Sequence, residues 1–259
     1  MEREEYEVLA QTEHSHWWHG GMRALALAVL DRTYGQRRDL HILDAGSGTG
    51  GNVRFLRRYA SAGGRVIGID LEAMALQLAA PTLAGVLTRG SVLHLPFADN
   101  SFDLVTSFDV LYHRGVPDEA TALREVSRVL RPDGRLLIRL PAYEFLRSKH
   151  DRAVHTRRRY RAAQVRHLLN EAGFRIEFLS YINTLLFPIP LAQRSLERTL
   201  PALERKDSDL TPPSVVVNTA LRVPMAVESA WVSRGGKFPF GLSVLALAQR
   251  SKLEQGRTL

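Results

Sequence analysis

The amino-acid sequence predicts an α/β protein whose core is a doubly wound, largely parallel β-sheet. Short apolar runs that are typical of buried strands alternate with stretches in which apolar residues recur at helical spacing. This alternation is the pattern of βαβ units, which build parallel sheets with helices on both faces. In addition, the first predicted strand, residues 41–43, leads directly into a glycine-rich loop at 44–51, as strands do where such sheets bind ligands.

The remaining elements are predicted in chain order from the same patterns. Residues 1–35 have helical spacing up to the break at Tyr34 and Gly35. The segment Arg131-Pro-Asp-Gly134 is a turn signal that should end the helix before it, and Gly173 should cap the helix before it. Strands are predicted at 41–43, 65–70, 102–107, 135–140, 175–181 and 241–248, and the main helices between them at about 53–59, 120–130 and 162–172.

The chain divides into four predicted parts. Residues 1–35 form an amino-terminal helical cover, and residues 36–182 form the sheet core. Residues 183–240 form a helical insertion with several prolines, and residues 241–259 hold the last strand and a tail. A long connection inside a compact domain usually has a function, so we expect the insertion to be a lid or a substrate wall.

Composition narrows the class of protein. The 259 residues include no cysteine, which excludes disulfides, thiolate metal sites and cysteine nucleophiles and fits a cytoplasmic location. The net charge of +8 is typical either of a solvated arginine-rich surface or of a protein that binds an anionic partner. No apolar run reaches the ~20 residues of a membrane-spanning helix, so we expect at most peripheral contact with a membrane.

The glycine-rich loop fits two ligand classes when it is considered alone. Gly46, Gly48 and Gly51 satisfy the dinucleotide fingerprint G-x-G-x-x-G, and Asp70 follows at the spacing of the acid that binds a ribose. Equally, residues 44–50 satisfy D-x-G-x-G-x-G. In both cases bare glycine backbone lets a ligand lie against the loop.

Two later segments favour the second interpretation. Residues 90–105 resemble G-D-A-x-x-L-P-F-x-D-x-S-F-D, with Ser91 in place of the first Asp, and residues 123–134 resemble L-x-E-x-x-R-V-L-K-P-G-G, with differences at the turn. In this order the motifs resemble the class I S-adenosylmethionine-dependent methyltransferases, in particular the type 11 methyltransferases. The resemblance implies a Rossmann-like, seven-stranded sheet with an antiparallel last strand, and S-adenosyl-L-methionine as cofactor.

The resemblance also implies a set of cofactor-binding residues. The methionine part would lie on the glycine loop, the ribose on the acid after the second strand, and the adenine beside Ser91, a weaker acceptor than the usual Asp. Residues 13–23 resemble the E-x-x-H-W-W-(F/Y)-x-x-R segment of a bacterial subset of the family, which implies that this helix covers the cofactor. The implied residues are Asp44, Gly46, Ser47, Gly48, Gly50, Asp70, Leu71, Ser91, Val92, Phe108, Trp18 and Arg23.

Catalytic candidates follow the strand at 102–107, because ligands bind at the carboxyl ends of parallel strands. Asp109, Tyr112 and His113 are placed there, and His113 is the best candidate for a general base because imidazole titrates near neutrality. The alternative is that His113 bonds to backbone and shapes the pocket.

The loop at 147–161 resembles a stretch of the same bacterial subset. It carries His150, Asp151 and His155, but no fourth ligand signal, so we predict no metal. We interpret the loop as a wall of the acceptor pocket that offers Arg158 and Arg159 to an anionic group; a solvated basic loop is the alternative.

The sequence therefore predicts an S-adenosylmethionine-dependent methyltransferase that moves a methyl group to an oxygen or nitrogen of a small-molecule or lipid- or sugar-linked acceptor. S-adenosyl-L-homocysteine would be the product. Two other functions stay open at this point: a nucleic-acid methyltransferase, for which we find a basic chain but no binding module, and a non-catalytic protein that binds the cofactor within a complex.

Overall fold

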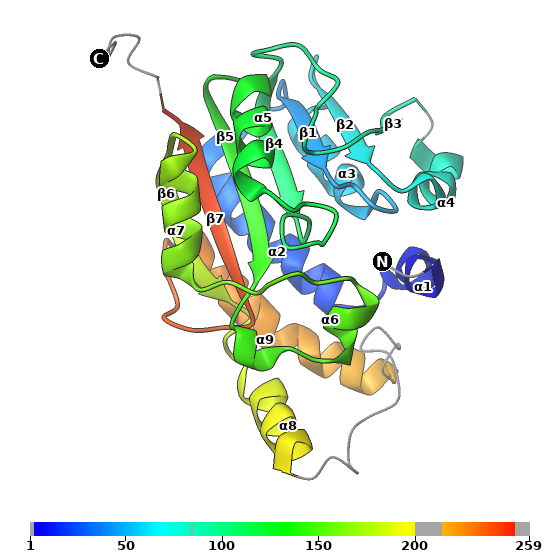
Figure 1. Ribbon diagram of the computed structural model, residues 1–259, viewed down its shortest axis with the longest axis vertical. Helices are drawn as coiled ribbons and strands as arrows, with labels where there is room; N and C mark the ends of the chain where they lie inside the picture. Colours follow the sequence, from blue (N-terminus) through cyan, green and yellow to red (C-terminus); the bar gives the residue numbers. More distant parts are fainter. Residues whose placement is uncertain (1–2, 84, 200–213, 252–259) are drawn as a thin grey trace.

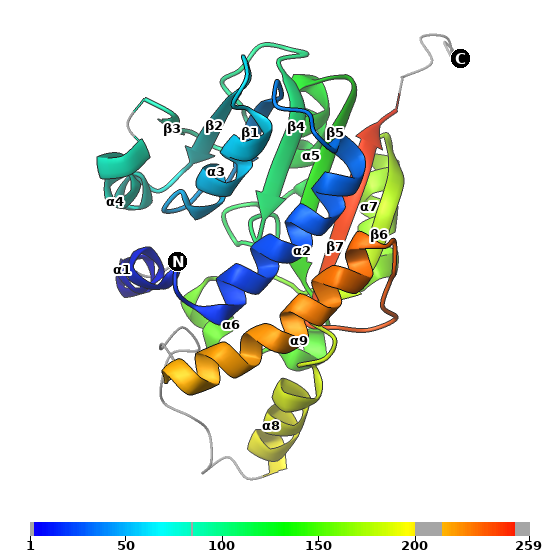
Figure 2. The ribbon, with the colours of Figure 1, turned by 180° about the vertical axis from the view of Figure 1, so that it is seen from behind.

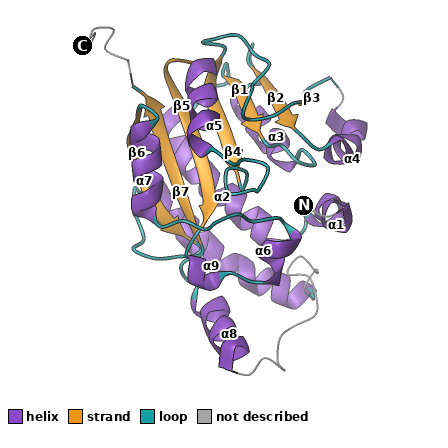
Figure 3. Ribbon diagram, in the orientation of Figure 1, coloured by secondary structure: helices purple, strands orange, loops and turns teal. Residues whose placement is uncertain are grey.

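A seven-stranded sheet forms the centre of the protein. The computed structural model describes residues 3–83, 85–199 and 214–251. Within them the strand order is β3-β2-β1-β4-β5-β7-β6, and every neighbouring pair is parallel except the pairs that β7 makes with β5 and β6 (Figures 1 and 3). The Rossmann-like sheet with its antiparallel last strand is thus confirmed. The strands are β1 His41–Ala45, β2 Arg65–Asp70, β3 Leu87–Arg89, β4 Phe102–Phe108, β5 Leu130–Pro141, β6 Phe174–Ile182 and β7 Ser243–Arg250.

Helices cover both faces of the sheet, and two apolar clusters fill the space between them and the strands. In Figure 1, α5 and α7 lie in front of the sheet, and Figure 2 shows α2, α3 and α9 on the opposite side. The helices that the structure describes are α1 Arg3–Thr12, α2 Trp17–Tyr34, α3 Gly51–Leu56, α4 Ala73–Leu83, α5 Glu119–Val129, α6 Lys149–Ala153, α7 Ala162–Glu171, α8 Pro188–Thr199 and α9 Val215–Ser233, with short 3-10 turns at Arg57–Tyr59 and Glu144–Leu146.

Two local predictions differ from the structure. The predicted turn at residues 131–134 lies inside β5, where the pairing register with β4 shifts from Leu130 to Arg135. The chain bulges there, and Asp133 adopts a φ of 63°, a conformation that Asp and Asn tolerate better than most residues. The loop at 147–161 also contains a short helix, α6, which begins with a capping box between Ser148 and Asp151.

The amino-terminal cover consists of two helices rather than one. His16 caps α2 by accepting a hydrogen bond from the backbone N–H of Trp18, and Gly35 ends the helix at a φ of 55°. The helix α1 stands apart from the sheet, beside α4 (Figures 1 and 2). The four-part division predicted from the sequence stays a prediction.

The helix α9 of the insertion packs along α2. Met225 lies against Gly21, where a Cβ atom would come within 2.7 Å of the methionine side chain. The hydroxyl of Ser229 donates to the carbonyl of Ala24, and the backbone N–H of Trp17 donates to Asn218 Oδ1 at 2.7 Å. The insertion therefore supports α2, which belongs to the predicted cofactor cover.

Candidate active site

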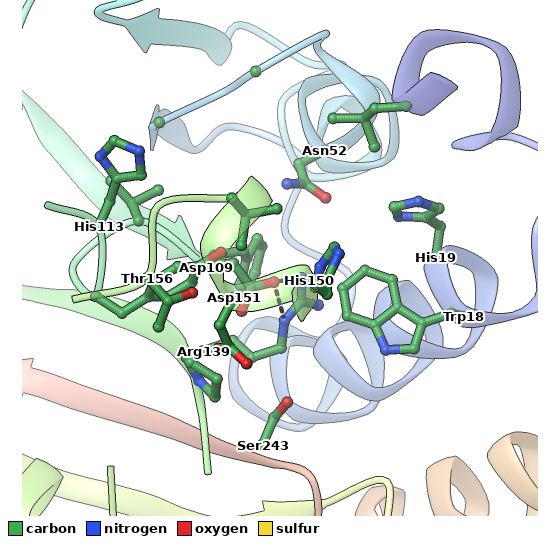
Figure 4. A pocket seen from close by; sticks show the side chains of 18 of the residues that line it. Trp18, His19, Asn52, Asp109, His113, Arg139, His150, Asp151, Thr156 and Ser243 are labelled. Carbon is green, nitrogen blue, oxygen red and sulfur yellow. Dashed lines mark hydrogen bonds and ion pairs between the residues drawn. The ribbon is translucent and has the colours of Figure 1, made fainter. Parts of the chain in front are cut away.

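A cavity of about 560 Å³ lies where the carboxyl ends of β1, β2, β4 and β5 meet. Its walls come from the glycine loop, from α1 and α2, from residues 108–116 after β4, and from α6 and α8. Figure 4 shows side chains of α2, α6 and the ends of β4 and β5 gathered around it. The cavity thus brings together segments that are far apart in the sequence.

The glycine loop presents bare backbone to this cavity. The N–H groups of Gly46 and Ser47 donate to the carbonyl of Ile69 at 2.8 and 2.9 Å, which ties the loop to β2. Gly46 has a φ of 90°, and a Cβ atom there would come within 2.1 Å of Val110. At Gly48 a Cβ atom would meet nothing closer than 4.0 Å, so the loop surface is open on the cavity side. Only glycine permits this path of the chain.

Asp70 holds the loop from the end of β2. One carboxylate oxygen accepts the N–H of Gly48 at 2.8 Å, and the other accepts the N–H of Glu72 at 3.0 Å. Burial raises the pKa of Asp70, although the backbone N–H groups oppose the shift. A carboxylate has about four acceptor positions, so capacity remains for hydroxyl groups of a ligand.

Two predicted binding residues lie behind the loop instead of lining the cavity. Asp44 is fully buried; one of its oxygens accepts from the Thr106 hydroxyl at 2.7 Å, and burial raises its pKa to about 7. Gly50 has a φ of 85° at the start of α3, and a Cβ atom there would meet Leu83 at 2.2 Å. Both residues shape the loop from behind, and their predicted part in cofactor binding stays a prediction.

Glu13 was not predicted as a site residue, yet it lies at the centre of the cover. Its carboxylate accepts from the Thr49 hydroxyl at 2.7 Å and rests on Gly51, where a Cβ atom would come within 2.4 Å of it. Arg23 donates to the Glu13 carbonyl at 2.7 Å, and both residues line the cavity. Burial raises the pKa of Glu13 and lowers that of Arg23. The Glu13 and Arg23 side chains, one acidic and one basic, are therefore held side by side above the glycine loop.

Arg139 occupies the end of β5 as a buried cation. Its guanidinium lies 5.0 Å from the Trp18 ring and 5.2 Å from the Phe108 ring, and its Nε donates to Asp109 at 2.9 Å. Asp109 has a φ of 59°, which directs it to this partner. The sequence indicated Asp109 as a catalytic residue; in the structure its carboxylate is paired with the Arg139 guanidinium.

His113 and Tyr112 both line the cavity. The Nδ1 atom of His113 accepts the N–H of Gly115 at 3.0 Å, and burial lowers the pKa of the imidazole to about 4. A neutral imidazole that accepts through Nδ1 carries its proton on Nε2. In this arrangement His113 shapes the loop after β4, which was the alternative considered from the sequence. Burial raises the pKa of Tyr112, so its hydroxyl is neutral.

The arginines of the 147–161 loop are engaged by carboxylates of this chain. Arg159 binds Asp151 through two nitrogen atoms, at 2.8 and 3.1 Å, and Arg158 pairs with the buried Glu119 at 2.7 Å. They are therefore not the open anion site that the sequence predicted. Because Asp151 is committed to Arg159, it is not available to a metal, and the described residues contain no group of three or more acidic, histidine or cysteine side chains that could hold one.

The far end of the cavity has a different character. Ser91, Val92 and Leu71 line it, as do Tyr6 and Leu9 of α1. The Ser91 hydroxyl accepts the N–H of Leu93 at 3.2 Å. This end is mainly apolar with few polar groups, as a planar heterocycle requires.

The sequence matches a known family over the part that builds this site. Residues 43–138 match the family model described as a methyltransferase domain. The chain is 37% identical over 137 residues to a demethylmenaquinone methyltransferase of Lactiplantibacillus plantarum, a match that covers 50% of this chain and 53% of the relative. It is 38% identical over 112 residues to the ubiquinone/menaquinone biosynthesis C-methyltransferase UbiE of Klebsiella pneumoniae, covering 40% and 43%. The chain spans about half the length of these relatives, or less.

Solved structures share the fold. The putative methyltransferase in a complex with the Trm112 methyltransferase activator of Haloferax volcanii has a TM-score of 0.60 at 22% identity, covering 97% of this chain and all of that one. Phosphoethanolamine N-methyltransferase 2 of Haemonchus contortus, solved with S-adenosyl-L-methionine, has a TM-score of 0.57 at 19% identity, covering 95% and 60%. Residues 43–138 thus form a methyltransferase domain, and the chain has the fold of solved methyltransferases. The dinucleotide interpretation of its glycine loop is thereby set aside.

The cavity of this methyltransferase domain fits the cofactor, S-adenosyl-L-methionine. The open glycine backbone, the acid at the end of β2 and the apolar end near Ser91 suit an adenosine, and Glu13 with Arg23 suits an amino-acid group. The buried Ser47 hydroxyl has no hydrogen-bond partner among the described residues, which leaves it for a ligand. No helix in the described ranges is long and apolar enough to cross a membrane.

Proposed function

We propose that this protein transfers the methyl group of S-adenosyl-L-methionine to a ring carbon of a hydroxylated, quinone-type small molecule. The observation that carries this proposal is the single continuous cavity, which joins the glycine loop to a chamber beside Trp18, His19 and His150. An aromatic and imidazole wall suits a planar ring with polar substituents. The names of the relatives support carbon as the accepting atom, in place of the oxygen or nitrogen expected from the sequence.

The cofactor would be held from both ends of the cavity. Asp70 would accept from the ribose hydroxyls, and Ser91 would lie at the adenine. At the other end the Glu13 carboxylate would bind the α-ammonium group and Arg23 the α-carboxylate, because a planar guanidinium suits a carboxylate. The bound cofactor supplies an electrophilic methyl group, and the chain has to orient the acceptor and exclude water.

Proton removal from the acceptor hydroxyl would make the ring carbon more nucleophilic. His113 is the proposed base, but it would have to release the Gly115 N–H before Nδ1 could take a proton. Its low pKa leaves it unprotonated at neutral pH. If His113 is the base, His113→Ala will lower kcat by about 100-fold or more. Turnover that stays within a few-fold of wild type would remove His113 from the mechanism.

The class of acceptor is tested directly with purified protein. Reduced naphthoquinones and benzoquinones with short side chains are incubated with S-adenosyl-L-methionine, and S-adenosyl-L-homocysteine and the methylated ring are measured by mass spectrometry. We expect carbon-methylated product from at least one quinol. Methyl ethers formed from phenols, or methylated amines, with no carbon-methylated product from quinols, would contradict the proposed acceptor and leave the methyltransferase activity standing.

A lipid-linked acceptor is the finer form of the same proposal. The chamber reaches Pro190 and Gln193 of α8, so a chain attached to the ring would leave the cavity between α6 and the insertion. The absence of cysteine is compatible with a reducing compartment, and we propose action in the cytoplasm.

A further inference from the structure

The helix α9 exposes a continuous apolar stripe to solvent. Val216, Val223, Val227 and Trp231 are 78%, 61%, 56% and 52% exposed. Their spacing of seven, four and four residues places them on one face of the helix over four turns. Single exposed apolar residues are ordinary on a protein surface, but an aligned row on one rigid helix indicates an interaction surface.

The opposite face of α9 already has its partners. Met225, Glu228 and Val232 are buried against the body of the protein. The two oxygens of Glu228 accept the backbone N–H groups of Asn183 and Leu185, each at 2.7 Å. These bonds, together with the contacts to α2, fix the helix in place. The exposed stripe is therefore a permanent outer surface and not the inner face of a helix that has swung open.

The charge around the stripe selects the kind of partner. Glu228 is the sole acidic residue of α9, and it is fully buried. The exposed charged residues on and just beyond the helix are Arg222, Arg234 and Lys237. Trp231 stands at the end of the stripe, with its indole N–H 3.5 Å from the carbonyl of Lys237. An apolar row with a terminal Trp and basic neighbours is the pattern of helices that lie at the surface of an anionic membrane.

The helix α8 also carries exposed apolar side chains. On α8, Ile189 and Leu196 are exposed apolar residues, while Pro190 and Gln193 of the same helix line the cavity. Figure 2 shows α9 on the outside of the molecule with α8 beyond it. Exposed apolar side chains are thus also present on the helix that borders the acceptor chamber.

We propose that the outer face of α9 docks the protein on an anionic lipid bilayer. The apolar stripe enters the interfacial region while Arg222, Arg234 and Lys237 meet lipid phosphates. This inference does not depend on the acceptor proposed above, although it would bring the chamber close to a lipid-soluble substrate.

Vesicle sedimentation with the full-length protein tests the inference without any methyl acceptor. One set of vesicles contains phosphatidylglycerol and phosphatidylethanolamine, and the other contains phosphatidylcholine alone. We expect the protein to bind the anionic vesicles and to be released by salt. The variant V223E/V227E should need at least about tenfold more lipid for half-maximal binding, because each new charge opposes the surface potential.

The matched control is Q77E/L78E on α4. It introduces the same charge change and also replaces an exposed leucine, but away from the stripe. We expect it to bind vesicles as the wild-type protein does, and melting temperatures will verify that both variants are folded. Equal binding by V223E/V227E and the wild type, or no binding by the wild type, would overturn the inference. So would a stable dimer in sedimentation velocity that V223E/V227E dissociates, because the stripe would then belong to a second copy of the chain.

Discussion

Replacing Glu13 by glutamine removes one charge from the cover while leaving its shape unchanged. The glutamine oxygen can still accept the Thr49 hydroxyl, and the side chain can still rest on Gly51. The change therefore isolates the carboxylate charge, which we assign to the α-ammonium group of the cofactor. S-adenosyl-L-homocysteine carries this group, whereas 5′-methylthioadenosine has the same adenosine and sulfur without the amino-acid end.

The expected size of the effect follows from the burial of the group. The Glu13 side chain is 7% exposed, so water screens its charge little. A hydrogen bond to a charged group contributes about 1.5–3 kcal/mol, which corresponds to a Kd about 10- to 150-fold higher for S-adenosyl-L-homocysteine. The Kd for 5′-methylthioadenosine should change by less than about twofold, since the change adds only a neutral amide where that ligand has no partner.

Isothermal titration calorimetry with both ligands measures the two effects. Glu171→Gln on α7 serves as control, because it removes a charge from the exposed surface and should affect neither affinity. Equal weakening of both ligands would mean that Glu13 acts only by holding the glycine loop, and unchanged affinity for both would mean that the ammonium lies elsewhere. Either result refutes the assignment.

Two further substitutions test the other end of the site and the residue behind it. Asp70→Ala should weaken S-adenosyl-L-homocysteine binding by about 100-fold or more, because two hydrogen bonds from the ribose and the hydrogen bond from the Gly48 N–H are lost together. Unchanged affinity in calorimetry would refute the ribose assignment. Burial raises the folded-state pKa of Asp44 to about 7 from 3.8. The contribution of this group to the free energy of unfolding is therefore fully present below pH 3.8 and is lost as pH rises through about 7, at roughly 1 kcal/mol for each pH unit. In urea unfolding, Asp44→Asn should therefore flatten the loss of stability between pH 5 and 7, and an unchanged slope would show that Asp44 is already ionised there.

The features that the sequence predicted are those that depend on neighbours in the chain. A strand, a glycine loop and a helix follow one another within about 15 residues, so the loop and the position of Asp70 could be read directly. The seven-stranded sheet with its antiparallel last strand followed from motifs that resemble a known family. The turn predicted at 131–134 was wrong because a Pro-Asp-Gly sequence also suits a bulge, and only the pairing with β4 distinguishes the two.

The features that the sequence could not predict depend on contacts between distant segments. The ion pair of Arg139 with Asp109 and that of Arg158 with Glu119 each join separate elements, so from the sequence Asp109 seemed available for catalysis and Arg158 for an anionic group. Glu13 stood inside the motif at 13–23 but was not singled out, because nothing local shows that the cover folds back onto Thr49. Likewise, the apolar residues of α9 gave no sign of which face would be buried.

The turn that leads into the cofactor cover is held by the same helix that carries the exposed stripe. Asn218 of α9 accepts from the backbone N–H of Trp17 and donates to the Ser15 carbonyl at 3.0 Å, and Arg222 donates to that carbonyl at 2.6 Å. Any change that docking on a bilayer makes to these contacts of Asn218 and Arg222 therefore acts on the turn between Glu13 and Trp18. Linkage between two binding sites is reciprocal. If vesicles raise the affinity for S-adenosyl-L-homocysteine by some factor, S-adenosyl-L-homocysteine should raise the affinity for anionic vesicles by the same factor, which for ordinary coupling is about fivefold or more. Vesicle titrations with and without the ligand measure this factor, and a value of one would mean that α9 is a rigid support whose docking leaves the cofactor cover unchanged.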